Sequence, residues 1–397
     1  MNKEEWRLLW PWYVSIFLFQ LASMGMLILF VYFSSKGFSF SEIALAWAVA
    51  NITMFLFEIP TGAVADIFGR KLSVTLAGLA IGIIFLLFPF AENIFTLSLL
   101  FFLWGLAATF SSGAEEAWLV DYLNYQNKKY LVQKVFITMS FISSLAVILT
   151  GITLGVAVNV YKVSNLDFVW YVAGISTIVG TAFSWLFPEY FVKRKVTINK
   201  AYRETINYVK KGFIHIKKHP VLLYLTLSFL AFAWSSTFVS IAEQPFILDI
   251  GLNAGWLGYL GSIIAGLNLF IITKVQLFLK KAGSEKDYLF FVYLIRAMLL
   301  LFVFLFLSPV IGFSFLVMLG ILGNITSPIE SAYYQKHTLS KQRATISSIK
   351  NMLVRGATVV PIIFSGIFLD KFGTVNSFIV AGLLSLISIA FLLKIRD

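Results

Sequence analysis

Long apolar stretches separated by short polar connections recur along the whole chain. A helix that crosses a bilayer needs about 20 mostly apolar residues, and twelve stretches of about that length can be marked. The one long connection falls at about residues 190–220. The pattern therefore predicts an all-α integral membrane protein with twelve transmembrane helices. The expected spans lie at about residues 9–33, 41–65, 72–91, 95–120, 135–160, 167–189, 221–246, 255–279, 287–307, 310–333, 344–369 and 375–394.

The composition agrees with this pattern and excludes several classes of protein. Of the 397 residues, 59% are hydrophobic and 13% are charged, whereas soluble domains are about 45–50% apolar and about 25% charged. A sequence without cysteine has no disulfides, thiolate metal sites or cysteine nucleophiles. The three histidines form no metal-binding motif, and no GxxxxGK[ST] phosphate loop occurs. Neither a metal, a cofactor, an enzymatic activity nor an ATP-driven pump is therefore expected.

The basic residues predict an orientation. If the N-terminus is cytoplasmic, 24 of the 31 Lys and Arg residues fall in loops on that side and three on the other. This asymmetry places both termini in the cytoplasm of a multi-pass protein in the cell (cytoplasmic) membrane. It also accounts for the net charge of +12 without a nucleic-acid partner. The start "MNKEEWRLLWPWY" runs straight into a full-length apolar stretch, so no cleavable signal is expected.

The long connection divides the chain into two halves. Residues 1–190 form an expected N-terminal six-helix bundle, 191–220 a basic linker, and 221–397 a C-terminal six-helix bundle. Matching residues occur 214 positions apart, at corresponding places in the two halves, which indicates duplication. Repeated halves are common in transporters, with the site between them. The matching pairs are Gly37 with Gly251, Gly69 with Gly283, and Glu116 with Glu330.

The linker has its own pattern, because its apolar residues recur at steps of three and four while lysines occupy the other positions. This spacing predicts an amphipathic helix within 191–220. Such a helix would lie on the anionic inner leaflet of the membrane, or it would pack beneath the two halves as a tether. The apolar stripe consists of Ile198, Tyr202, Ile206, Val209, Phe213 and Ile216.

The segment "GAVADIFGRK", residues 62–71, closes the second span at the cytoplasmic side. Its pattern, G-x-x-x-D-x-x-G-R-K, resembles the loop signature of the major facilitator superfamily. The resemblance extends over essentially the whole chain. It implies twelve transmembrane helices in two pseudo-symmetric six-helix bundles. The segments "EIPTG" and "KQRATISSIKNM" resemble a broad prokaryotic branch of permeases and drug exporters.

The resemblance implies a cytoplasmic latch between the halves. Asp66 would face the positive start of helix eleven, near Arg343, and Arg70 would pair with an acid low on helix four, for which Asp121 is well placed. Gly62 would allow close approach of a neighbouring helix, and Gly69 a tight turn. Alternatively, Arg70 and Lys71 merely follow the excess of positive charge on the inside.

Ionisable groups inside spans are candidate functional residues. Glu58 and Arg355 are expected at a similar depth on helices two and eleven, which are neighbours in the family, and we hypothesise an ion pair across the halves. The alternative is that each pairs within its own half or extends toward the membrane surface.

Three glutamates lie on helices four and ten, which line the cavity in the family. They are Glu115, Glu116 and Glu330. One of them could couple transport to protons, or all three are end charges near lipid headgroups. Because consecutive helical residues point about 100° apart, only one of Glu115 and Glu116 is expected to face the cavity.

Other polar residues within the spans either line a cavity or bond one helix to another. Glu243 is expected near the outer mouth or in solvent, Lys274 near the membrane surface, and Arg296 on the lipid side. The uncharged group comprises Gln20, Asn51, Trp234, Asn268, Asn324 and Asn351.

The predicted function is secondary active transport of a small solute by alternating access, with protons as the expected driving force. Efflux of drug-like or amphipathic compounds is favoured, although helix five lacks the Gly-Pro signature of drug antiporters. The alternatives are a solute uptake permease or a lipid or glycolipid flippase on the same fold. A monomer is expected, with the solute, protons and membrane lipids as its partners.

Overall fold

The computed structural model describes residues 3–161, 163–190, 210, 213–271, 274–337 and 343–395. Within these ranges, only the backbone is described for residues 3–4, 164, 275–278 and 343–353. Within these ranges the regular structure is entirely helical. The helices are α1 Lys3–Leu21, α2 Ser23–Leu27, α3 Leu29–Ser35, α4 Phe40–Phe68, α5 Arg70–Leu87, α6 Ile94–Ser111, α7 Ala114–Tyr125, α8 Val132–Val160, α9 Asp167–Trp185, α11 Pro220–Asp249, α12 Gly255–Ile271, α13 Val275–Ala282, α14 Glu285–Leu301, α15 Pro309–Lys336 and α16 Arg343–Leu393.

The predicted number of spans is confirmed. Nine helical segments in the described part of the chain are long and apolar enough to cross a membrane. One of them belongs to α16, which is two helices joined at Gly373, where φ is +76°. The remaining two spans are α12 and α14, each with 17 residues. Both are shorter than the other spans, and α14 also carries three charged residues in its first turn and Arg296 in its interior.

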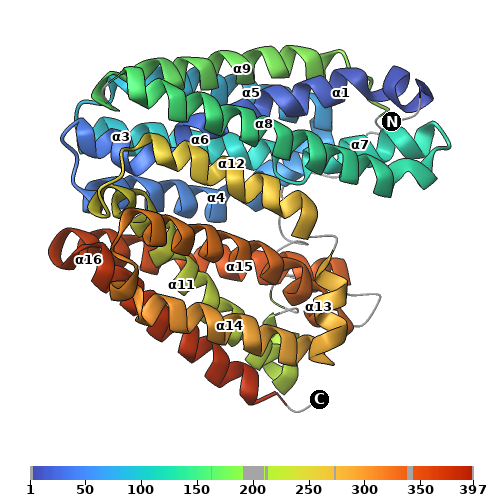
Figure 1. The fold of residues 1–397 in the computed structure, drawn as a ribbon. Helices are drawn as coiled ribbons and strands as arrows, with labels where there is room; N and C mark the ends of the chain where they lie inside the picture. The colour runs from blue at the N-terminus through green and yellow to red at the C-terminus, as the bar shows by residue number, and fades with distance from the viewer. Residues whose placement is uncertain are drawn as a thin grey trace.

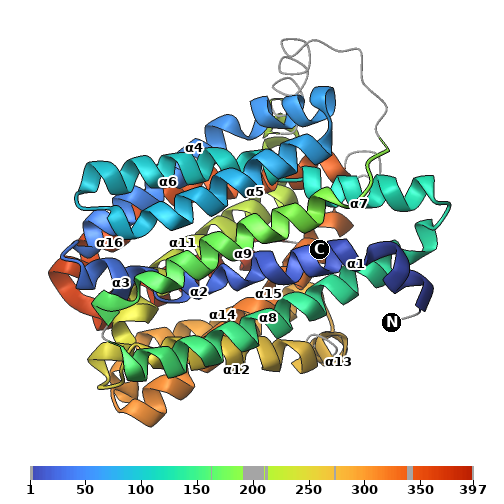
Figure 2. The same cartoon turned by 90° about the horizontal axis from the view of Figure 1, so that it is seen from above.

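The helices form two groups, as Figure 1 shows. Helices α1 to α9 make one group and α11 to α16 the other. The groups contact each other mainly where α8 packs against α12 and where α4 packs against α16, at opposite flanks of the molecule in Figure 2. The start of α1, α7, α13 and the end of α16 lie at one end, which we call the basic end. In Figure 1 the groups diverge toward the basic end and meet at the opposite end.

Hydrogen bonds across the two groups gather at the end opposite the basic end. The Gln244 side chain accepts a bond from the Phe30 backbone N–H at 2.8 Å and donates to the Met26 carbonyl at 3.0 Å. Asp370 accepts bonds from the backbone N–H groups of Phe40 and Ser41, at 2.9 and 2.8 Å. These bonds satisfy N–H groups in the first turn of α4, which have no partner within their own helix. The two groups are therefore fastened together at this end.

The duplication expected from the sequence has structural support. The paired glycines share a left-handed backbone, with φ of +100° at Gly37 and +84° at Gly251. The second pair also shares a positive φ, with +107° at Gly69 and +88° at Gly283, although their ψ angles differ. The bond from Phe30 to Gln244 joins residues that are themselves 214 positions apart. A contact between equivalent residues of two repeats is expected on the axis that relates them.

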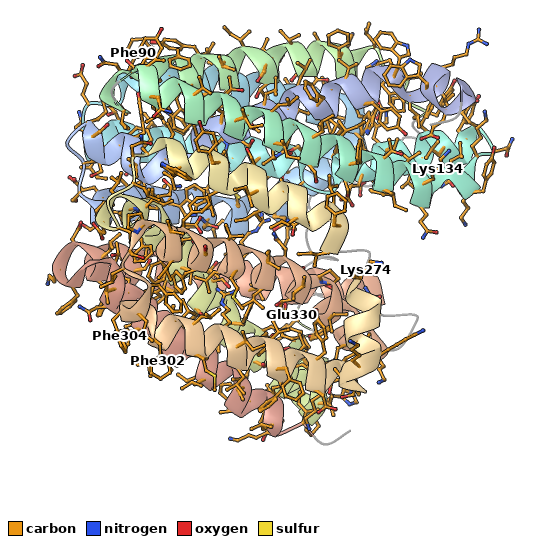
Figure 3. All side chains as sticks on the ribbon, in the orientation of Figure 1. Phe90, Lys134, Lys274, Phe302, Phe304 and Glu330 are labelled. Atoms are coloured by element: carbon orange, nitrogen blue, oxygen red, sulfur yellow. The ribbon has the colours of Figure 1, made fainter. Side chains whose placement is uncertain are left out.

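The outer surface of both groups carries large apolar side chains. Phe90, Phe302 and Phe304 point away from the helices in Figure 3, with exposed fractions of 65%, 50% and 52%. Water would disfavour so much exposed apolar surface, whereas lipid tails accept it. The surface is therefore that of a protein whose flanks contact lipid.

Candidate functional site

The turn between α4 and α5 carries the sequence motif. Gly69 ends α4 and begins α5, and its φ of +107° disfavours residues that have a Cβ. The close helix approach expected at Gly62 is not observed, because a Cβ there would meet none of the described atoms within 4 Å. The tight turn at Gly69 is thus present, while Gly62 has space around it in this conformation.

Arg70 and Asp121 are brought together as the motif predicted. The Nη1 atom of Arg70 donates a hydrogen bond to Oδ2 of Asp121 on α7. Both residues belong to the first helix group, so this pair fastens α5 to α7. It does not by itself connect the two groups. The role of the pair in a latch stays a prediction.

Glu189 completes this turn, and the sequence reasoning missed it. Its Oε1 accepts bonds from the backbone N–H groups of Arg70, at 2.6 Å, and Lys71, at 3.0 Å. A carboxylate at this position complements the positive end of α5. The Lys71 ammonium lies 4.5 Å from the centre of the Trp185 ring. The available signal was the segment "FPEY", which places one acid between the sixth span and the basic linker.

The expected partner of Asp66 is the start of α16. Helix α4, which carries Asp66, packs against α16, as that prediction requires. The side chains of residues 343–353 lie outside the described part of the chain, so the contact of Asp66 with Arg343 stays a prediction. Asn351 falls in the same range.

Glu58 and Arg355 connect the two groups. The Nη1 atom of Arg355 on α16 lies 3.8 Å from Oε2 of Glu58 on α4. Their side chains are 36% and 35% exposed. The hypothesised pair across the halves is therefore present in this conformation. Pairs this exposed contribute about 0–1 kcal/mol, which suits a contact that forms and breaks between conformations.

Two cavities lie between the helix groups. One, of about 480 Å³, is lined by Glu116 together with Asn268 and Asn324. The other, of about 330 Å³, is lined by Asn51 and Glu243. Asn51 also donates a hydrogen bond to the Trp47 carbonyl at 2.9 Å. Glu243, expected in solvent or at the outer mouth, instead lines this cavity, because the helix face that carries it turns toward the first group.

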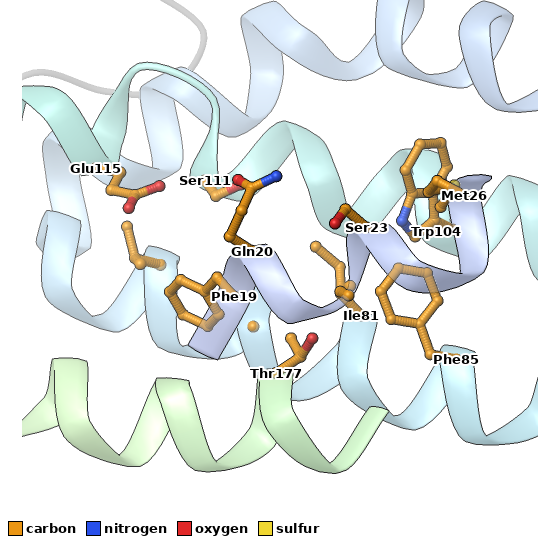
Figure 4. A pocket seen from close by; sticks show the side chains of 13 residues that line it. Phe19, Gln20, Ser23, Met26, Ile81, Phe85, Trp104, Ser111, Glu115 and Thr177 are labelled. Carbon is orange, nitrogen blue, oxygen red and sulfur yellow. The ribbon is translucent and has the colours of Figure 1, made fainter. Parts of the chain in front are cut away.

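Glu115 faces a third cavity, of about 360 Å³, inside the first helix group (Figure 4). Glu116 lines the cavity between the groups. Only one of the two carboxylates, that of Glu116, therefore lines a cavity between the groups, in keeping with the angular separation of consecutive helical residues.

The second group contains a buried charged cluster. Tyr293 on α14 donates a hydrogen bond to Glu330 on α15 at 2.5 Å, in the region labelled in Figure 3. Arg296 is 3% exposed, donates to Ser236 at 3.0 Å and lies 4.5 Å from the centre of the Phe232 ring. The expectation that Arg296 faces lipid is therefore wrong. Hydropathy cannot distinguish a lipid-facing position from a protein-facing one when both surroundings are apolar.

The remaining predicted residues have simpler surroundings. Lys274 is exposed, in keeping with a place near the membrane surface (Figure 3). The Trp234 indole N–H is buried with no hydrogen-bond acceptor among the described atoms. The amphipathic helix predicted within 191–220 falls mainly on residues 191–209, 211 and 212, which lie outside the described residues.

Comparisons with known proteins agree with this geometry. The family model described as Major Facilitator Superfamily matches residues 12–361. An uncharacterized MFS-type transporter, YxaM of Bacillus subtilis (strain 168), is 23% identical over 90% of this chain and 88% of its own. A mutant of the nucleoside transporter NupG has a TM-score of 0.81 at 14% identity, covering 97% of this chain and 98% of that one. A POT family transporter in complex with 5-aminolevulinic acid has a TM-score of 0.76 at 14% identity, covering 98% and 95%.

Proposed function

The chain belongs to the major facilitator superfamily and is a membrane transporter, and we propose that it moves a small solute by alternating access of its two helix groups. The observation that carries the proposal is the asymmetry of the contacts between the groups. Hydrogen bonds accepted by Gln244 and Asp370 close one end, whereas the groups diverge toward the basic end (Figure 1).

The basic end is the cytoplasmic one in this proposal. Basic loops are retained on the cytoplasmic side of a membrane, and 24 of the 31 basic residues fall in the loops of that side. The conformation is then open to the cytoplasm and closed to the exterior. Both termini lie in the cytoplasm, and the protein resides in the cytoplasmic membrane.

Protons are the proposed driving force, and export of amphipathic compounds is the proposed direction. Glu116 supports proton coupling because its carboxyl lines a cavity between the groups. A carboxyl that is exposed first to one side and then to the other can carry one proton per cycle. The polar partners Asn268 and Asn324 in the same cavity can bond either the charged or the neutral form.

Transport in proteoliposomes tests this proposal. We expect a pH gradient to drive accumulation of at least one compound from a chemically diverse panel. Glu116→Gln should abolish accumulation against a gradient while leaving exchange of solute at equal concentrations, because a neutral amide carries no proton. Glu92→Gln, at an exposed position in the opposite end, is the matched control. Accumulation that ignores the pH gradient, together with wild-type behaviour of Glu116→Gln, would contradict proton coupling through this residue.

The latch leads to a separate prediction. Asp121→Asn removes the charge from the partner of Arg70 and should lower the turnover of transport up to about fivefold, the effect of about 1 kcal/mol for a partly exposed pair. Asp66→Asn should also lower the turnover of transport. Turnover is measured per molecule of protein in proteoliposomes, after expression levels have been matched. Wild-type turnover in both variants would reject the latch.

A further inference from the structure

The cavity beside Glu115 lies within the first helix group, and Met26 lines both this cavity and the one that contains Asn51 and Glu243. All its lining residues belong to the first group, from α1, α2, α5, α6, α7 and α9 together with Ala22. Its volume of about 360 Å³ lies within the range of small-molecule sites, about 300–1,000 Å³. The proposed function does not use this cavity, so its contents need an explanation of their own.

The walls of the cavity are mostly apolar and aromatic. Phe19, Phe85 and Trp104 contribute rings, and Met26 and Ile81 contribute aliphatic surface, as Figure 4 shows. Aromatic faces attract positive charge as well as apolar groups. The walls therefore suit a compact molecule with a large apolar body.

Most of the hydroxyl groups on the wall already have partners within the protein. Thr177 donates to the Ala173 carbonyl at 2.7 Å, and Ser111 donates to the Ala108 carbonyl at 3.0 Å. Ser23 shares a 3.3 Å hydrogen bond with Thr150 on α8. The polar groups left to recognise a ligand are the Gln20 amide, the Trp104 indole N–H and the Glu115 carboxyl.

Glu115 is the charged group of the cavity. No described side chain forms a hydrogen bond or ion pair with its carboxylate, and no Lys or Arg is among the lining residues. In Figure 4 the carboxylate lies at one end of the cavity, with Trp104 and Phe85 toward the other. A negative charge in apolar surroundings is costly unless a positive partner joins it. An organic cation would supply that partner, whereas an anion would be repelled.

We propose that this cavity binds a lipophilic organic cation, with the positive centre against Glu115 and the apolar body among Phe19, Phe85 and Trp104. The proposal deepens the proposed function by naming a substrate class, and it rests on that function only for the statement that the cation is transported. Binding itself requires neither a gradient nor turnover.

The test uses tritiated tetraphenylphosphonium, a permanent cation with four aromatic rings, and the full-length protein in lipid nanodiscs. Saturable binding is expected, displaced by the unlabelled cation and not by tetraphenylborate, an anion of the same shape. Glu115→Gln should weaken binding at least tenfold, and Trp104→Leu should weaken it by a smaller factor. Glu92→Gln, an exposed carboxylate outside the cavity, should bind as the wild type does. Thermal unfolding of each variant verifies that the fold is retained.

Several results would overturn the proposal. They are the absence of saturable binding to the wild type, displacement by tetraphenylborate as effective as that by the cation, and unchanged affinity in Glu115→Gln. Loss of binding in Glu116→Gln but not in Glu115→Gln would place the cation between the helix groups and would overturn it as well. If a Glu115 variant does not fold, the competition between the two ions on the wild type still decides. Because no gradient is used, a negative result leaves the transport experiment with Glu116 unaffected.

Discussion

Gly258→Ala is expected to open the end of the molecule where the two helix groups meet and to reduce transport by at least about fivefold. A Cβ on Gly258 would lie 2.2 Å from the carbonyl oxygen of Gly151 and 2.9 Å from the backbone nitrogen of Gly155. Both atoms belong to the backbone of α8, so no side-chain rotation relieves the clash. Overpacking of this kind costs about 1–3 kcal/mol, and each 1.4 kcal/mol shifts an equilibrium about tenfold. The conformation that contains this contact should lose population.

Distances between spin labels measure this shift. The sequence contains no cysteine, so Phe95→Cys and Val310→Cys place labels on the two groups at this end without background. Both positions are exposed, at 74% and 79%. The distance between the labels should increase in Gly258→Ala. Gly266→Ala on the same helix is the matched control, because its Cβ would meet nothing nearer than 3.9 Å. An unchanged distance with unchanged transport would show that α8 and α12 need not approach this closely.

Arg296→Met is expected to lower the stability of the protein by about 1–3 kcal/mol. Removal of Arg296 leaves Ser236 without its donor and Glu330 and Glu243 without a nearby positive charge, and the loss of a buried polar partner costs about that much. Arg296 is 3% exposed and acts electrostatically on Glu330, Glu243 and Tyr293. Methionine retains most of the packing of the arginine stem, so the loss should be mainly electrostatic.

Thermal and denaturant unfolding of the purified protein in detergent provide the measurement. Lys129→Met, which removes an exposed cation, should change stability by no more than about 0.5 kcal/mol. Adding Glu330→Gln to Arg296→Met should restore part of the loss, because the two effects are not additive when the groups interact. A loss as small as that of the control, or a double variant less stable than the single one, would contradict the assigned role of the cluster.

The sequence could predict those parts of the site that follow from position along a helix. The depths of Glu58 and Arg355 were comparable from residue counts alone, and the structure places the two charges 3.8 Å apart. The pairing of Arg70 with Asp121 was implied by the resemblance to the family, and the structure contains this hydrogen bond. The separate directions of Glu115 and Glu116 followed from the angle between consecutive helical residues.

Other parts of the site depend on neighbours that are distant in the sequence. Glu189 accepts bonds from the start of α5 across 119 positions, and no local pattern indicates such a partner. Gly62 belongs to the motif but has open space around it. Whether such a residue makes a contact depends on how the helices pack against one another, and a sequence motif does not specify that packing.

The sequence by itself determined that the chain is a membrane protein of twelve spans, and it predicted two related halves with the basic loops on one side. Those properties depend on the length and hydropathy of each segment and on the distribution of charge, which are local. Only the tertiary structure decided which face of each helix is turned to protein. In a chain surrounded by lipid, apolar residues occupy both the lipid-facing and the protein-facing sides, so hydropathy no longer indicates the interior. For that reason the burial of Arg296, the cavity at Glu115 and the cap from Glu189 could be recognised only from the packed helices.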